Sequence, residues 1–131
     1  MEGIIPSAEI SPRIEQGIIF WYYRDTFQLE LVIKLRDEET LEPIKILPSE
    51  EIIVSFYQDE KCGLKGKQNQ TPIFSQVFNN IENNKIIIKI NDEITNRFTP
   101  GKYCYCIKYN YPNNRRTIVA DAKIEVEPCK N

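Results

Sequence analysis

The sequence predicts an all-β fold, and an antiparallel β-sandwich of about seven strands is its simplest form. Apolar residues recur at every second position almost throughout the chain, which is the period of a half-buried strand. No window keeps a period near 3.6, so a long amphipathic helix is not expected. Clusters of Pro, Gly and Asn separate the alternating runs at a spacing of roughly 8–15 residues. A closed barrel is the alternative architecture.

Five runs alternate most clearly, and we expect each to be a strand with one face in the core. They are residues 27–35, 52–57, 86–90, 103–109 and 118–126. Two weaker candidates are residues 17–24 and 73–78. The alternation argues against a parallel α/β sheet, whose strands would be apolar on both faces.

The breaks between these runs contain turn-forming residues. A loop is bracketed by Pro43 and Pro48, and Asn pairs at 79–80 and 83–84 precede the run 86–90. Residues 112–114, Pro-Asn-Asn, predict a hairpin tip, because Asn tolerates left-handed backbone and Pro presets φ. Residues 95–98 can form one helical turn, which Pro100-Gly101 would end.

The length of 131 residues and the 41% hydrophobic content indicate one domain with a real core. We assign residues 17–131 to this domain and residues 1–16 to an extended N-terminal arm. The net charge of −2 gives no basic field for nucleic acid. The apolar runs are too short to cross a membrane, and Met1-Glu2 does not open a leader peptide. We therefore expect synthesis in a cytoplasm, with neither nucleic acid nor membrane as a partner.

Four cysteines are present, and Cys104 and Cys106 lie two apart in one predicted strand. Their Cα atoms would be roughly 6.5–7 Å apart, at or beyond the limit for a disulfide. Zinc usually needs a second matched pair or His ligands, and the chain contains no His. For Cys62, Cys104, Cys106 and Cys129 we predict free, partly buried thiols without a metal or redox role.

The chain also lacks the motifs of the common enzymes. Without His, the usual general base and the usual activator of a Cys nucleophile are missing. Neighbouring carboxylates on a strand point to opposite faces and cannot converge on one substrate. Asp59-Glu60 could help to hold Ca²⁺, but a solvated loop is the simpler interpretation. We predict no enzyme, no catalytic residue, no cofactor and no metal site.

Aromatic residues give the most distinctive local signal. Four of them are consecutive, so two must lie on each side of their strand, and one pair must be covered by something outside the core. The N-terminal arm could cover them, or they could anchor a protein interface or stack on a sugar. Tyr103, Tyr105 and Tyr109 share one face and are expected in the core. The candidate interface residues are Ile4, Ile5, Ile10, Phe20, Trp21, Tyr22 and Tyr23.

The arm itself has two interpretations that the sequence leaves open. It can pack along the edge of its own domain, or it can reach a neighbouring subunit. An arm of the second kind can add a strand to an exposed sheet edge.

Arg24-Asp25-Thr26-Phe27 opens the first long strand, and Pro100-Gly101-Lys102-Tyr103 forms a corner before a later one. With these residues the chain resembles the immunoglobulin-like N-terminal domain of the phage baseplate upper protein family of tailed phages of Gram-positive bacteria. Three further stretches match. They are the loop 43–46 with the following strand 52–57, the strand 84–88 with the following Thr95 and Phe98, and the closing strand from 117–119 to 124–126. Arg24 stands where the family usually has Gly, and the family's long C-terminal extension has no counterpart.

The resemblance implies an immunoglobulin-like sandwich that acts as an attachment module in a virion. Its expected partners are other virion proteins of the tail, baseplate or capsid, with self-association as a further option. Capsid decoration suits an isolated domain as well as a baseplate role does. The alternative is a carbohydrate-binding or adhesin-type module in which an exposed Trp21 and its neighbours stack on sugar rings.

Overall fold

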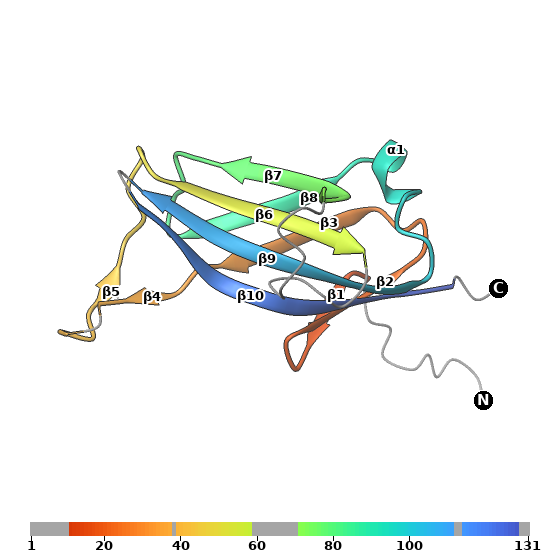
Figure 1. Cartoon of the computed structure of the whole chain (residues 1–131), viewed down its shortest axis with the longest axis horizontal. Coiled ribbons are helices and arrows are strands. Elements are labelled where there is room, and N and C mark those ends of the chain that lie inside the picture. The colour runs from red at the N-terminus through yellow and green to blue at the C-terminus, as the bar shows by residue number, and fades with distance from the viewer. Residues whose placement is uncertain (1–10, 38, 59–70, 112–113, 129–131) are drawn as a thin grey trace, which may run out of the picture.

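The computed structural model describes residues 11–37, 39–58, 71–111 and 114–128, except for the side chains of residues 120 and 121. Strands dominate these residues, and one short helix lies among them (Figure 1). The elements are β1 (Arg13–Glu15), β2 (Ile18–Tyr22), β3 (Phe27–Val32), β4 (Leu35–Arg36), β5 (Pro43–Ile44), β6 (Glu51–Gln58), β7 (Phe74–Phe78), β8 (Lys85–Ile90), α1 (Asp92–Thr95), β9 (Gly101–Tyr111) and β10 (Asn114–Glu127). The predicted β-rich class is therefore confirmed.

The largest sheet has six strands in the order β1-β2-β10-β9-β6-β7. Its neighbours are antiparallel except for β2 and β10, which run parallel with Val126 opposite Trp21. The prediction of a purely antiparallel fold is wrong at this pair. Parallel neighbours need a long connection, and here the segment from β3 to β9 supplies it. Strands β3 and β8 form a separate antiparallel pair, and β4 and β5 form another.

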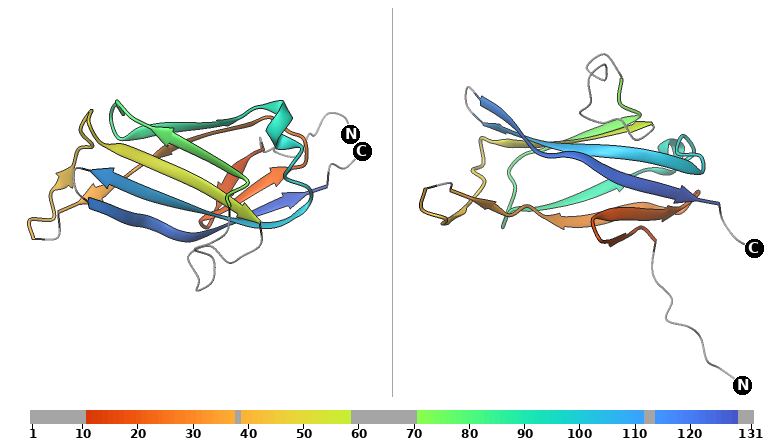
Figure 2. Two further views of the ribbon diagram at one scale, coloured as in Figure 1. Left: turned by 45° about the horizontal axis from the view of Figure 1, so that its top comes forward. Right: turned by 60° about the horizontal axis from the view of Figure 1, so that its bottom comes forward.

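The core lies between the six-stranded sheet and the β3–β8 pair, which form two layers (Figure 2). Strand β8 shows why these residues make a half-buried strand. Ile86, Ile88 and Ile90 are buried, whereas the alternating residues between them are exposed. One face of the strand is thus removed from water while the other is solvated.

Aromatic rings fill one part of this core. The ring of Trp21 lies 4.7 Å from that of Phe27 and 5.0 Å from that of Phe98, measured between centroids. Phe56 contacts Phe27 edge-on at 5.8 Å. Edge and tilted packing of this kind adds to the burial energy of each ring. Tyr103 and other tyrosines of β9 are also buried, as the sequence predicts.

All seven predicted strands are present, but three short ones were not predicted. The run 27–35 ends at Val32, and Leu35–Arg36 pairs instead with Pro43–Ile44 as the β4–β5 hairpin. The helix begins before the predicted residues 95–98, because the Asn91 side chain caps it by accepting a hydrogen bond from Ile94 N at 3.1 Å.

The third missed strand, β1, lies inside the segment assigned to the arm. Arg13 pairs with Phe20 and Glu15 pairs with Ile18, so these residues belong to the sheet. Pro12 is buried as well. The domain thus begins before residue 17, and residues 1–10 lie outside the described residues.

The corner before β9 is closed by a tyrosine. The Tyr103 hydroxyl donates to the backbone carbonyl of Thr99 at 2.5 Å. Gly101, with φ of 152°, supplies the backbone conformation that the turn needs. The Pro-Gly-Lys-Tyr segment therefore fixes where β9 starts.

Candidate functional site

The aromatic residues lie on a hairpin at the edge of the six-stranded sheet. Strands β1 and β2 are joined by Gln16 and Gly17, both with positive φ, which is the geometry of a tight hairpin turn. Strand β2 is held on its other side by β10. Because β2 is paired on both sides, the direction of each of its side chains is fixed.

Trp21 faces the core and therefore cannot belong to an exposed interface. It is 1% exposed, and its indole N–H donates to the Asp25 carbonyl at 3.0 Å. The hypothesis that an exposed Trp21 stacks on sugar is therefore wrong. The register explains the outcome, since Trp21 lies opposite the buried Val126.

Phe20 and Tyr22 alternate with the buried Ile19 and Trp21 and so lie on the opposite face of β2. Both are half-buried, and the Arg13 guanidinium lies 5.0 Å above the Phe20 ring. We call residues Arg13, Phe20 and Tyr22, with Glu125 and Lys102, the hairpin face. Beyond the end of β2, Tyr23 is half-buried with the Arg24 guanidinium 5.2 Å from its ring.

The hairpin face carries charges of both signs around its aromatic rings. Arg13 is opposite Phe20, Phe20 is opposite Glu125, and Glu125 is opposite Lys102. This row crosses four neighbouring strands of one sheet. Aromatic and Arg side chains with mixed charges around them are typical of protein-binding surfaces.

The other predicted interface residues, Ile4, Ile5 and Ile10, lie outside the described residues. The described part of the chain begins at Ser11, which lies beside β2. The Ser11 hydroxyl oxygen accepts a hydrogen bond from the Tyr22 backbone N–H at 2.9 Å. This contact places Ser11, the first described residue, at the end of β2.

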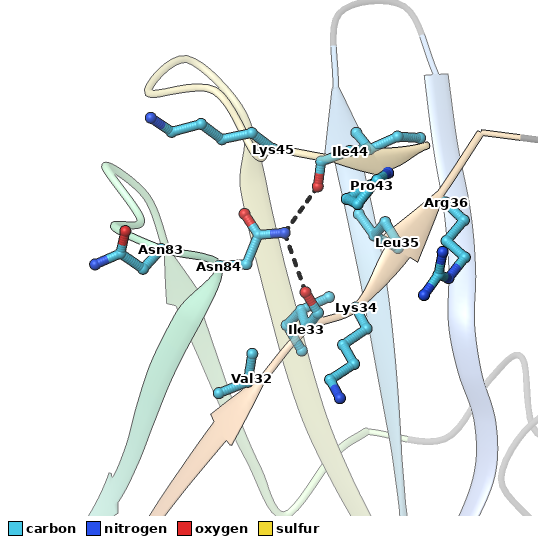
Figure 3. Close-up of a pocket in the computed structure, with 10 residues that line it drawn as sticks. All are labelled: Val32, Ile33, Lys34, Leu35, Arg36, Pro43, Ile44, Lys45, Asn83 and Asn84. Atoms are coloured by element: carbon cyan, nitrogen blue, oxygen red, sulfur yellow. Dashed lines mark hydrogen bonds between the residues drawn. The ribbon is translucent and has the colours of Figure 1, made fainter. Parts of the chain in front are cut away.

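A groove of about 560 Å³ lies between the β4–β5 hairpin and the turn before β8 (Figure 3). Asn84 holds these parts together. Its amide N–H₂ donates to the carbonyls of Ile33 at 3.1 Å and Ile44 at 2.8 Å, and its amide oxygen accepts from Ile46 N at 2.9 Å. The sequence identified Asn84 as a turn residue, and its φ of 55° agrees. No pattern in the sequence indicates its three hydrogen bonds to backbone groups distant in the chain.

The groove does not concentrate charge at one point. Lys34, Arg36 and Lys45 line it, and no acidic residue does. The ends of Lys34 and Lys45 point in different directions in Figure 3, away from Asn84. The groove is therefore better explained as a structural junction than as an anion site.

A second cavity, of about 480 Å³, contains a buried carboxylate that the sequence did not reveal. Glu50 is 7% exposed and accepts hydrogen bonds from the Tyr109 hydroxyl at 2.5 Å and from Leu47 N at 2.8 Å. Burial, and then the hydrogen bond to Glu50, raise the pKa of Tyr109 above its ordinary value. Glu50 thus ties the loop before β6 to β9.

The prediction of four free thiols is wrong for Cys104. This residue is disulfide-bonded, whereas Cys106 is a free, buried thiol. Burial raises the pKa of the Cys106 thiol, which disfavours the reactive thiolate. Cys62 and Cys129 lie outside the described residues.

Groups that could perform metal chemistry do not gather within the described ranges. These contain no cluster of three or more Cys, Asp or Glu side chains suited to a metal ion. Asp59 and Glu60 lie outside them. No helix in the described part of the chain is long and apolar enough to span a membrane.

Comparison with family models, with curated proteins and with solved structures gave no match to this chain.

Proposed function

We propose that the two layers form an immunoglobulin-like sandwich. Strands β10, β9, β6 and β7 would be one sheet with β2 added in parallel to β10, and β3–β8 would be the core of the other. The bond from the Tyr103 hydroxyl to Thr99 near the start of β9 matches the tyrosine corner of such sandwiches. Two departures are Phe56 at the place of the usual central Trp and the second layer of only two strands.

We further propose that the chain is a non-enzymatic structural component of a tailed-phage virion. It would attach to a larger assembly of tail, baseplate or capsid through its surface and its N-terminal segment. The observation that carries this proposal is the hairpin face, where Phe20 and Tyr22 are half-buried on β2, a strand that is paired on both sides. The resemblance to the phage baseplate family supplies the virion context.

The hairpin face would act by burying apolar area. A stable contact between proteins hides about 800 Å² on each partner. Aromatic anchors at its centre contribute most of the binding energy, whereas rim charges such as Glu125 and Lys102 mainly select the partner. The N-terminal segment, with Ile4, Ile5 and Ile10, would extend the buried area beyond the face.

Complementation of a phage that lacks the gene tests this proposal. The wild-type chain, F20S/Y22S and the control V77S are supplied from a plasmid, and the purified particles are probed by immunoblot. Val77 is 53% exposed on β7, at the opposite edge of the same sheet, so V77S also removes an exposed apolar side chain.

We expect F20S/Y22S to reduce incorporation at least tenfold and V77S to leave it unchanged. Circular dichroism of each purified variant checks that it folds. Wild-type levels of a folded F20S/Y22S protein in particles would rule out the hairpin face as the attachment surface.

A further inference from the structure

The cavity that contains Glu50 lies between two parts of the fold that are distant in sequence. One wall comes from the β4–β5 hairpin, where Leu35 and Ile44 are opposite each other. The other wall comes from the end of β9 and the start of β10, where Arg116 is opposite Tyr109. The volume of about 480 Å³ falls within the range of small-molecule sites, which combine apolar walls with a few polar groups.

The charged groups of this cavity are separated by depth. Glu50 is buried, whereas Arg36 and Arg116 are exposed, so the cavity is anionic at its buried end and cationic at its exposed end. No ion pair joins Glu50 to Arg36 or to Arg116 in the described part of the chain. Arg36 Nη1 donates instead to the Leu41 carbonyl at 3.1 Å, which holds this guanidinium at the exposed end.

The hydrogen bonds of Glu50 use only one of its oxygens. Oε1 accepts from the Tyr109 hydroxyl at 2.5 Å and from Leu47 N at 2.8 Å. Oε2 accepts no hydrogen bond from the described residues, and it is not among their fully enclosed atoms. Both donors are neutral, so no cation compensates the charge. Because a buried carboxylate is costly unless a cation lies beside it, Oε2 is a position at which a positively charged ligand group would be stabilised.

We propose that this cavity binds a free α-amino acid with an apolar side chain. The ammonium group of the ligand donates to Glu50 Oε2, and its carboxylate accepts from the guanidinium groups of Arg36 and Arg116. Guanidinium N–H groups match the geometry of a carboxylate and keep their charge. The apolar side chain of the ligand packs against Leu35 and Ile44, which removes it from water.

Two tyrosine rings add to the recognition of the ammonium group. Tyr109 and Tyr111 both line the cavity, and their ring centroids lie 4.8 Å apart. A cation within about 6 Å of such a ring is attracted to its face, which adds to the attraction by Glu50.

The arrangement of charges selects against ligands with a single charge. A simple amine would have its charge beside two guanidinium groups, and a simple carboxylate would meet Glu50 at the buried end. An amino acid matches both ends at once, so like-charge contacts exclude the two simpler classes. This inference goes beyond the attachment role and does not depend on it.

Nuclear magnetic resonance titration of the ¹⁵N-labelled full-length chain tests the proposal. The probes are L-leucine and L-phenylalanine. Isoamylamine, which is leucine without its carboxylate, and N-acetyl-L-leucine, whose nitrogen carries no charge, are the matched control ligands. We expect saturable shifts for at least one amino acid at the backbone amides of residues 35–36, 44, 50, 109–111 and 116–118, and binding at least tenfold weaker for each control ligand.

Two variants with matched controls test the assigned side chains. E50Q keeps an oxygen that can accept from Tyr109 and Leu47 N but removes the charge. Its control is E51Q, because Glu51 is bonded to the Asn110 side chain at 3.2 Å and does not line the cavity. R116Q and its control R115Q change neighbouring exposed side chains of β10, of which only Arg116 lines the cavity.

We expect E50Q and R116Q each to weaken binding at least tenfold and the two controls to leave it unchanged, with circular dichroism confirming that all four variants fold. The absence of shifts with either amino acid up to about 10 mM would overturn the proposal. So would an unchanged affinity in R116Q, whose exposed side chain can be replaced without loss of the fold. Equally tight binding of isoamylamine would also overturn it, because the cavity would then accept a cation alone.

Discussion

The Tyr109–Glu50 pair should make the fold less stable at alkaline pH. Burial and the bond to Glu50 raise the pKa of Tyr109, and burial also raises the pKa of Tyr57 and of Tyr105. An unfolded phenol ionises near pH 10, so above that pH the unfolded chain binds fewer protons than the native one. The contribution of these three tyrosines to the free energy of unfolding should therefore be constant below about pH 10 and fall as the pH rises further.

Y109F should make this fall less steep, because it removes one of the three contributing phenols. The measurement is urea unfolding at a series of pH values from about 8 to about 11. Y111F is the comparison variant, since the tilted Tyr111 ring lies 4.8 Å from that of Tyr109 and contributes least to its raised pKa, whereas the hydrogen bond to Glu50 comes from Tyr109. An equal pH dependence in Y109F and the wild type would show that Tyr109 does not contribute to the loss of stability at alkaline pH.

Asn84 is the side chain whose loss should affect the β4–β5 end of the fold most. N84A breaks three hydrogen bonds to backbone groups and puts Ala at a φ of 55°. We expect a loss of about 3 kcal/mol in the free energy of unfolding. N83A is the control, because Asn83 has the same φ but an exposed side chain. Similar losses in the two variants would show that the backbone conformation, and not the bonds, decides the effect.

The two cysteines of β9 should react differently with alkylating reagents. Cys106 is free and buried with a raised pKa, so native protein should take up iodoacetamide only slowly, while protein unfolded in urea should react at once. Cys104 should be modified only after reduction. Rapid labelling of Cys106 in the native protein, followed by peptide mass spectrometry, would contradict its burial.

At the scale of elements, alternation predicts strands well and short hairpins badly. Every second residue of strand β8 is a buried Ile, and the strand was predicted within one residue of its observed start, although Ile87 stands between Lys85 and Lys89 on the exposed face. Strands β4 and β5 have two residues each, too few to show any period. What holds them is the side chain of Asn84, forty residues later in the chain, which no local pattern indicates.

Strand β2 shows a different limit of sequence reasoning. Four consecutive aromatic residues reveal that two must face outward, but not which two. Pairing with β10 decides it, because Val126 is buried opposite Trp21. The candidate interface therefore loses the buried Trp21, and its other members, Ile4, Ile5, Ile10, Phe20, Tyr22 and Tyr23, remain predictions.

Substitutions on β2 should separate the two faces. W21A removes a fully buried ring in contact with Phe27 and Phe98 and should lower the free energy of unfolding by about 3–5 kcal/mol. Y22A changes a half-buried ring on the outer face and should cost about 1 kcal/mol or less. Chemical denaturation measures both, and a larger loss in Y22A than in W21A would contradict the observed register.

At the scale of the whole molecule, the outer face of the six-stranded sheet is more buried than a half-solvated sheet requires. Cys104 and Cys106 alternate with the core residues Tyr103, Tyr105 and Ile107, yet they are 0% and 7% exposed. The sequence predicted partly buried thiols at these two positions, and both are almost completely buried. A period of two within one strand does not show which of its outward positions other parts of the chain cover.

Our central proposal is that this domain attaches to a tailed-phage virion as a non-enzymatic component. The direct test is quantitative mass spectrometry of tailed particles purified from cells that produce both the chain and such particles. We expect the chain in those particles at a copy number that is fixed relative to the major tail or capsid protein and is unchanged by a further density-gradient step. Its absence from purified particles, while the same cells contain it in abundance, would rule out the proposed attachment.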